Sequence, residues 1–333
     1  MKKTKIISFL LLSTTVVMLT SSCGLRLPNF SKQDPQNTQT VLAASPSVES
    51  TPISTPFKEQ PFVELRKAFV KLEEAKYLKN ITIMDINSFG QKTHFKSYIE
   101  GDSDNKNIYI KRDYEQLGIT YTSNFYTKDS YVYMLNAGYD KYIKKAYSTE
   151  KELYEALSIS DTDEIFGDSY DENNSTYSQE TVKIVGEETV KVNNVDIKTS
   201  SYKLTLPEDK RQKYIDDNII SLVYNKDADY TIEEDAQIKK VIDGMKVNKL
   251  EILFYLDTNG SIVKTLETVD VEFVDNDDLH VFENVINNKI VYSLSTEIFD
   301  YDVQVVVDYP AFTVANTISW EDFLALANEG SST

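Results

Sequence analysis

The sequence predicts an α+β domain in which one large curved antiparallel sheet packs against a few helices. Runs rich in Ile, Tyr, Thr and Phe recur between residues 81 and 138 and are separated by short turn segments, as in antiparallel meanders. Amphipathic helical stretches precede and follow these runs. The chain of 333 residues is 41% hydrophobic and contains 22 Tyr, so it has enough apolar material for a real core.

The N-terminus has the plan of a secretory signal. Lys2, Lys3 and Lys5 precede an apolar run over 6–19, which is shorter than a membrane-spanning helix requires. Small residues then lead into Cys23, the single cysteine of the chain. A lone cysteine outside the cell has no disulfide partner, which favours a lipid anchor over an incidental cysteine behind an ordinary cleaved signal.

The placement of Cys23 resembles the lipobox of bacterial lipoproteins. The resemblance implies cleavage of a 1–22 signal peptide, diacylglycerol on the Cys23 thiol with a further acyl chain such as palmitate, and a place on the extracytoplasmic face of the cell membrane. Thr20 departs from the pattern, because that box usually has Leu three residues before the cysteine. Acylation of this kind anchors a protein without a spanning helix.

Residues 23–60 are expected to form a disordered tether. They are rich in Pro, Ser, Thr, Gln and Asn, and such a segment cannot bury enough surface to order itself. The folded domain is expected to begin near Pro61 and to extend as a single unit to 333. A C-terminal extension is expected from about 276.

The elements of this domain follow from periodicity and turn chemistry. An apolar stripe predicts the first helix over 62–75, and Thr149 with Glu152 fits a capping box for a short helix. Asn193-Asn194 is expected to join two strands, and Asn259-Gly260 to form the tip of the hairpin 249–273. Further helices are expected over 208–224, over 232–245 behind a second capping box, and over 319–328.

One long strand is expected over 289–309. Its apolar positions are even up to Ile298 and odd from Phe299 onwards. Since a slip of one residue moves every side chain to the other face, this pattern predicts a bulge or a corner near Ile298.

The lipobox, the Pro-rich tether, the amphipathic first helix entering a meander and the hairpin 249–273 together resemble the LolA/LppX-like half-barrel lipoproteins. The nearer likeness is to their poorly characterised relatives in Gram-positive bacteria. Segments 126–146 and 192–207 lie where that family has strands, and the likeness covers most of 61–275. The resemblance implies a half-barrel with an apolar cavity between sheet and helices, which holds acyl chains or lipidated partners.

The facing patterns suggest which side chains line such a cavity. Phe69 and Leu72 are expected on the first helix. Opposite them we expect Tyr121, Tyr133, Phe254 and Leu266 on the sheet. The alternative is that tyrosines simply occupy half-buried strand positions, which they favour in any sheet.

The sequence offers little for catalysis or metal binding, and no cofactor is expected. His94 and His280 are the only histidines, and neither has the context of a nucleophile with a base. The acidic loop with Asp161, Asp163 and Glu172 resembles an EF-hand loop but has Phe166 where the turn glycine belongs. The formal net charge of −18 argues against binding to nucleic acid.

Three functional hypotheses remain at this stage. The first is a non-enzymatic lipoprotein that binds a lipid or another apolar ligand in a half-barrel cavity. The second is a cell-envelope lipoprotein whose core is filled by its own side chains and which binds a protein partner. An enzyme is the least favoured of the three, because it requires polar groups that converge in a cleft with shifted pKa values.

Overall fold

The computed structural model describes residues 60–102, 106–116, 118–136, 138–157, 176–224, 230–274, 279, 286–301 and 303–330. Cys23, the tether, the acidic loop at 161–172 and His280 lie outside these residues. The helices are α2 (Pro61–Glu74), α3 (Glu150–Leu157), α5 (Glu208–Asn218), the 3-10 turn η1 (Ile220–Leu222), α6 (Ile232–Asp243) and α7 (Trp320–Gly330).

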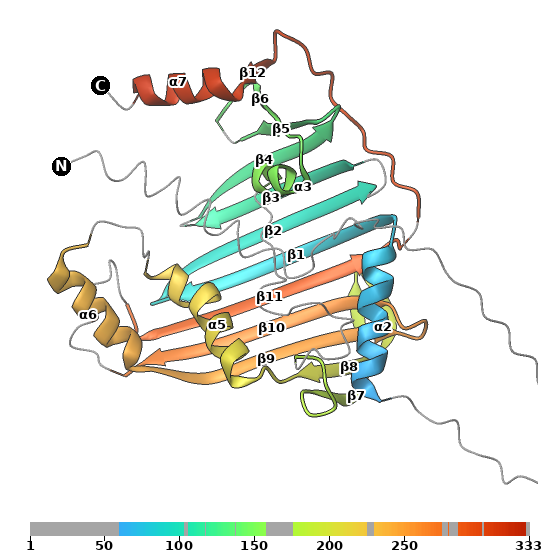
Figure 1. Ribbon diagram of the computed structural model, residues 1–333, viewed down its shortest axis with the longest axis vertical. Helices are drawn as coiled ribbons and strands as arrows, with labels where there is room; N and C mark the ends of the chain where they lie inside the picture. Colours follow the sequence, from blue (N-terminus) through green and yellow to red (C-terminus); the bar gives the residue numbers. More distant parts are fainter. Residues whose placement is uncertain are drawn as a thin grey trace, which may run out of the picture.

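Twelve strands in the described part of the chain form one sheet (Figure 1). They are β1 (Tyr77–Ser88), β2 (Gln91–Asp102), β3 (Asn107–Gln116), β4 (Ile119–Lys128), β5 (Tyr131–Leu135), β6 (Tyr142–Ala146), β7 (Val182–Val192), β8 (Val195–Leu204), β9 (Met245–Asp257), β10 (Ile262–Phe273), β11 (Lys289–Phe299) and β12 (Thr317–Ser319). Their order is β12-β6-β5-β4-β3-β2-β1-β11-β10-β9-β8-β7. The pairings are antiparallel except for β12 with β6, which are parallel.

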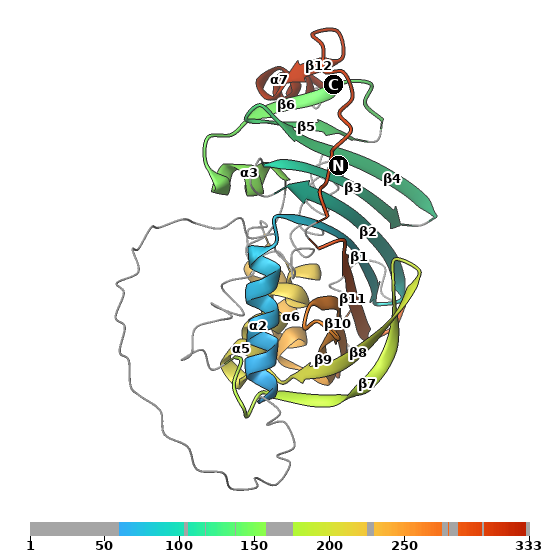
Figure 2. The same ribbon diagram turned by 90° about the vertical axis from the view of Figure 1, so that its right-hand side faces the viewer.

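The sheet is strongly curved, and α2, α3, α5 and α6 lie on its concave side (Figure 2). This arrangement confirms the predicted α+β class with a half-barrel sheet. The residues from 276 onwards contribute both to the middle of the sheet and to its edge, because β11 lies between β1 and β10 while β12 pairs with β6.

Local sequence accounts for most of the turns and helix ends. Asn193 and Asn194 both adopt positive φ (46° and 66°) between β7 and β8, as the tight hairpin turn requires. At α6 the Thr231 hydroxyl accepts from the Glu234 backbone N–H, and the Glu234 carboxylate accepts from the Thr231 N–H, which completes the capping box. The matching pair at α3 is Thr149 with Glu152.

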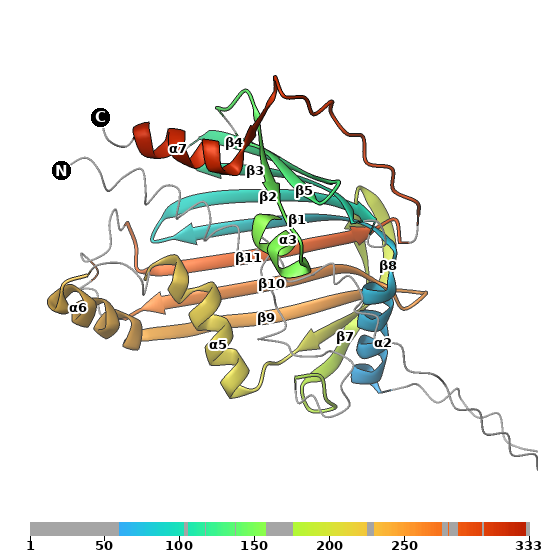
Figure 3. The same ribbon diagram turned by 45° about the horizontal axis from the view of Figure 1, so that its top comes forward.

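The long strand expected over 289–309 is wrong in its second half. β11 ends at Phe299, and Asp300 takes a φ of 56°, so a corner does lie close to Ile298. The chain then continues without strand pairing over 303–316. We call this segment the C-terminal strap; it runs along the ends of the strands towards β12 and α7 (Figure 3). Val305 and Val307 are buried while Val306 is exposed, so an extended chain lying on a surface produced the alternation that resembled a strand.

Most buried apolar residues of the described chain fall into three clusters. The main core lies between the concave face and the helices α2 and α5, and includes Leu65, Met84 and Leu294. The upper core joins β3–β6 to α3 and α7 around Ile110, Phe125 and Leu153. A third, smaller cluster lies where the far ends of β7 and β8 fold against β9 and β10; it consists of Val192, Tyr255 and Val263 with partly buried neighbours.

Candidate functional site

The strand register divides the side chains of the sheet between its two faces. Thr82 pairs with Ser97 on β2 and with Thr296 on β11, and these positions share the concave face with Met84 and the rest of the main core. Their immediate chain neighbours point to the convex face, because side chains alternate along a strand. The same register assigns each remaining residue of these strands to the concave or to the convex face.

Three of the six residues predicted to line a cavity meet in the main core. Phe69 of α2 contacts the ring of Phe254 edge-on, with ring centroids 5.3 Å apart, and the ring of Tyr177 at 5.1 Å. Leu72 lies on the same helix and is 7% exposed. The first helix therefore packs against the concave face through the stripe that the sequence indicated.

Tyr121 also lies on the concave face but far from this group. It is on β4, six strand spacings from Phe254 on β9, and its ring neighbours that of Tyr114 at 6.4 Å. Both tyrosines are only half-buried, so this part of the concave face is reached by water.

The placement of Leu266 opposite the first helix is wrong. Leu256 pairs with Ile262, but Phe254 pairs with Thr265, so Val263 is an extra residue in β10. This bulge reverses the facing of every later residue of the strand. Leu266 therefore points to the convex face and packs in the small cluster around Val263.

The placement of Tyr133 opposite the helix is wrong as well. Val132 and Met134 are the residues of β5 that enter the upper core, so Tyr133 between them points to the convex face. There its ring stacks on Phe312 of the C-terminal strap, with centroids 3.8 Å apart. Phe312 also contacts Tyr126 and Tyr142, so the strap covers part of a tyrosine-rich surface.

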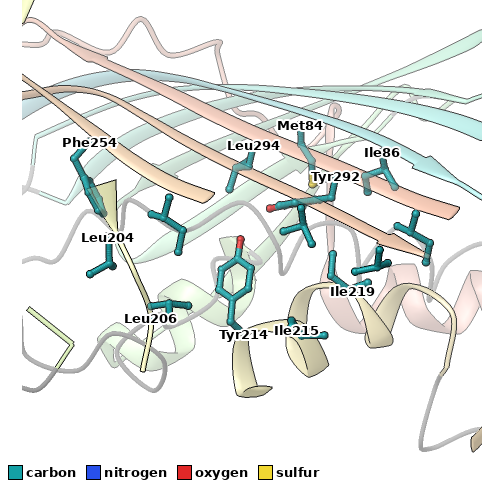
Figure 4. Close-up of a cluster of buried hydrophobic side chains, with 14 of the residues drawn as sticks. Met84, Ile86, Leu204, Leu206, Tyr214, Ile215, Ile219, Phe254, Tyr292 and Leu294 are labelled. Carbon is teal, nitrogen blue, oxygen red and sulfur yellow. The ribbon is translucent and has the colours of Figure 1, made fainter. Parts of the chain in front are cut away.

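The main core contains a buried acidic group. Glu267 on β10 is 4% exposed, and its Oε2 accepts a hydrogen bond of 2.5 Å from the hydroxyl of Tyr214 on α5. Figure 4 shows Tyr214 pointing from the helix towards the sheet, where Tyr292 lies nearby. Burial and the Glu267 carboxylate raise the pKa of both tyrosines well above the ordinary range, so both remain neutral.

A polar row crosses the concave face at right angles to the strands. Cross-strand pairing aligns one inward side chain from each of six neighbouring strands. From β10 to β4 the row consists of Thr265, Thr296, Thr82, Ser97, Arg112 and Ser123. Sequence reasoning missed this row because its members come from segments up to 214 positions apart, and only the register shows that they are neighbours.

Arg112 is the charged member of the polar row. Its side chain is 4% exposed, and its guanidinium lies over the ring of Phe125 at 4.8 Å. Arg112 also interacts with at least one residue besides Phe125. Desolvation lowers the pKa of Arg112 to about 10, which still leaves it charged at neutral pH.

No arrangement for catalysis emerges from the described residues. His94 lies on the surface with its Nδ1 2.8 Å from Asp85 Oδ1, and both side chains are well exposed. The described ranges contain no group of three or more His, Cys, Asp or Glu side chains that could hold a metal ion. In the same part of the chain, no helix has the length and apolar character needed to cross a bilayer.

Comparison with known proteins gives similar solved structures but no relative by sequence. No family model and no curated protein matches the chain. The lipoprotein LppX of Mycobacterium tuberculosis is similar at 10% identity and a TM-score of 0.35, over 74% of this chain and 97% of that one. A DUF1329 family protein from Desulfovibrio piger is similar at 12% identity and a TM-score of 0.22, over 74% and 93%. Kinship with Gram-positive relatives stays a prediction.

Proposed function

We propose that the protein is a lipoprotein, anchored through Cys23 on the extracytoplasmic face of the cell membrane, that binds a lipid or another apolar ligand on the concave face of its sheet. It performs no chemistry on that ligand. The observation that carries the proposal is the concave face itself. Apolar side chains from neighbouring strands form one continuous cluster there, and separate helices cover it. Apolar, concave and helix-covered surfaces are the usual setting for such ligands.

A second function is favoured by how well the main core is packed. Leu65, Met84 and Ile298 are fully buried, whereas side chains that line a cavity would remain accessible. This observation supports an envelope lipoprotein whose interior is filled by its own side chains and which acts by binding a protein partner. If the main core is filled in this way, an apolar ligand could bind only at another part of the concave face, such as the half-buried region of Tyr114 and Tyr121.

Native mass spectrometry of residues 24–333, which lack the proposed anchor residue Cys23, purified from a bacterial host, distinguishes the two. The lipid-binding function predicts a stoichiometric acyl species that co-purifies and is identified after solvent extraction. Phe69→Ala should reduce its occupancy, because Phe69 packs on the concave face against Phe254. Leu266→Ala is the matched control on the opposite face and should leave occupancy unchanged.

A ligand-free mass in repeated preparations, with no uptake of added lipids, would reject the lipid-binding function in favour of the protein-partner function. Equal loss of ligand from both variants would show that the ligand does not sit on the concave face. Thermal unfolding of each variant checks that the fold is retained.

A further inference from the structure

The polar row lies in an otherwise apolar surface. On one side of it are Met84, Phe95 and Leu294 of the main core, and on the other Ile110 and Phe125 of the upper core. Within the row, the Thr82 and Thr296 hydroxyls lie 3.0 Å apart and bond to each other. A stripe of hydrogen-bonding groups therefore separates two apolar parts of the concave face.

One buried hydroxyl at the centre of this stripe is unsatisfied, and so is one buried amide oxygen in the row of side chains next to it. Ser97 is 1% exposed and Asn80, two positions before Thr82 on the same face of β1, is 2% exposed. Neither Ser97 Oγ nor Asn80 Oδ1 has a hydrogen-bond partner among the described residues. Leaving such an atom unpaired costs about 1–3 kcal/mol. The Ser97 hydroxyl can donate to an anion, whereas the Asn80 amide oxygen only accepts and would need a donor, so Ser97 is the atom that supports an anion site.

Arg112 directly follows Ser97 in the row and supplies positive charge. A guanidinium has five N–H donors, so Arg112 can bind an anion in addition to the contacts that it already makes. The next position is the half-buried Ser123, and Tyr121 and Tyr114 beside it are also half-buried. The charged end of the row is therefore the end nearest to water.

We propose that the polar row is a head-group site for an amphiphile that carries one anionic group, a carboxylate or a phosphate, on an alkyl chain. The anion contacts Arg112, Ser97 offers its hydroxyl, and the chain lies along the apolar concave surface beside the row. This inference rests on the proposed lipid-binding function and narrows its ligand class. The protein as a whole is strongly negative, so a local cation is needed to hold an anionic ligand.

The test compares three monoacyl probes that share one chain: oleate, oleoyl lysophosphatidate and the neutral monoolein. Their affinities for residues 24–333 are measured by isothermal titration below the critical micelle concentration of each probe. We expect at least one anionic probe to bind about tenfold more tightly than monoolein, the size of effect that one charge-assisted hydrogen bond produces. Whichever anionic probe binds better identifies the head group as carboxylate or phosphate.

Arg112→Gln should remove this preference, so that the anionic probes bind no more tightly than monoolein. Lys111→Gln is the matched control, because Lys111 is the preceding residue of β3 and is exposed on the convex face. Ser97→Ala serves if Arg112→Gln fails to fold. It deletes a hydroxyl without a protein partner, so we expect unchanged stability and a severalfold weaker anionic probe.

The outcomes separate this inference from the function on which it rests. Tight binding of all three probes with no preference, or a preference that survives both Arg112→Gln and Ser97→Ala, overturns the head-group site but not lipid binding. Failure of all three probes to bind overturns both. A preference lost equally in Lys111→Gln would show that overall charge, and not the polar row, selects the ligand.

Discussion

At the scale of single residues, hydrogen bonds between polar side chains join two of the covering helices to the sheet. The Tyr214 hydroxyl reaches from α5 to the buried Glu267 carboxylate, and the Tyr202 hydroxyl on β8 donates to Glu64 of α2 at 2.5 Å. Each bond connects a covering helix to the concave face. Because a buried donor or acceptor is costly without its partner, such bonds fix where each helix sits as well as how strongly it is held.

Tyr214→Phe tests the bond within the core. The change keeps the ring but removes one donor from the buried Glu267 carboxylate, so we expect a loss of about 1.5–3 kcal/mol in the free energy of unfolding. Urea denaturation measures this loss. Tyr224→Phe is the control, since its hydroxyl donates to Asp235 at 2.6 Å at the protein surface, where water replaces the lost partner. Equal effects of the two variants would contradict the role assigned to the buried bond.

The half-buried tyrosines near the C-terminal strap predict a sensitivity to alkaline pH. Burial first, and then the neighbouring Tyr109, raises the pKa of Tyr126 to about 12; burial likewise raises that of Tyr309 to about 12. The unfolded chain releases these protons near pH 10, before the folded protein does. Between about pH 10 and pH 12 the folded state thus binds more protons, and its stability falls as the pH rises.

Denaturation followed at several alkaline pH values measures this effect. Below about pH 10 these two groups should make no contribution to the pH dependence of stability, and above it stability should decline as the pH rises. Tyr126→Phe should make the decline shallower. A decline of the same steepness in the variant would remove Tyr126 from the explanation.

At the scale of elements, one bulge and one turn decide how neighbouring strands fit. The bulge at Val263 reverses the facing of β10 and thereby puts Thr265 and Glu267 on the concave side. The β1–β2 turn at Phe89 and Gly90 binds a segment that is distant in the chain. The Phe89 carbonyl accepts the backbone N–H groups of Ile286 and Asn287, while the Phe89 N–H donates to the Lys289 carbonyl.

Gly90→Ala should destabilise the protein more than Gly260→Ala. Both glycines have positive φ, 94° and 72°, so an added methyl group is strained at either position by about 1–2 kcal/mol. At Gly90 the new Cβ would also lie 2.6 Å from the Cβ of Ile286, whereas at Gly260 it meets open space. Thermal unfolding compares the two. Equal shifts in Tm would show that the contact with the 286 segment adds nothing.

At the scale of the whole molecule, the proposed anchor and the proposed binding face belong to different parts of the chain. The predicted signal and tether precede the described domain, whose sheet, helices and strap are formed by residues 60–330. A tether of this composition would separate the domain from the membrane, and the negative charge of the chain would keep it from lying on anionic lipids. Ligand exchange with a membrane would then depend on the length of the tether.

The anchor is tested by mass spectrometry of the mature N-terminal peptide from membranes of the native host. We expect the peptide to begin at Cys23 and to carry the mass of a diacylglyceryl group on its thiol. Cys23→Ser should lack that mass and should lose the anchor that the thiol provides. A mature N-terminus at another position, or an unmodified thiol, would contradict lipid attachment.

The sequence alone determined the features that depend on neighbouring residues. Propensities and hydrogen bonds that span only a few positions account for the extent of α2 and for the capping boxes before α3 and α6. They also account for the turns at Asn193-Asn194 and Asn259-Gly260. The class of the fold followed from the number and order of these elements. Phe69, Leu72 and Phe254 are predicted to face one another across a cavity; they lie in one cluster because their local periodicity continues without interruption into the structure, and their lining of a cavity stays a prediction.

Only the tertiary structure decided the strand order and the facing of particular side chains. β11 enters between β1 and β10, and the extra residue Val263 moves Leu266 to the convex face. The polar row depends on both, because it exists only where six strands are in one register. Register is fixed by the joint packing of all strands and helices, and a single added residue reverses it, so no local pattern contains that information.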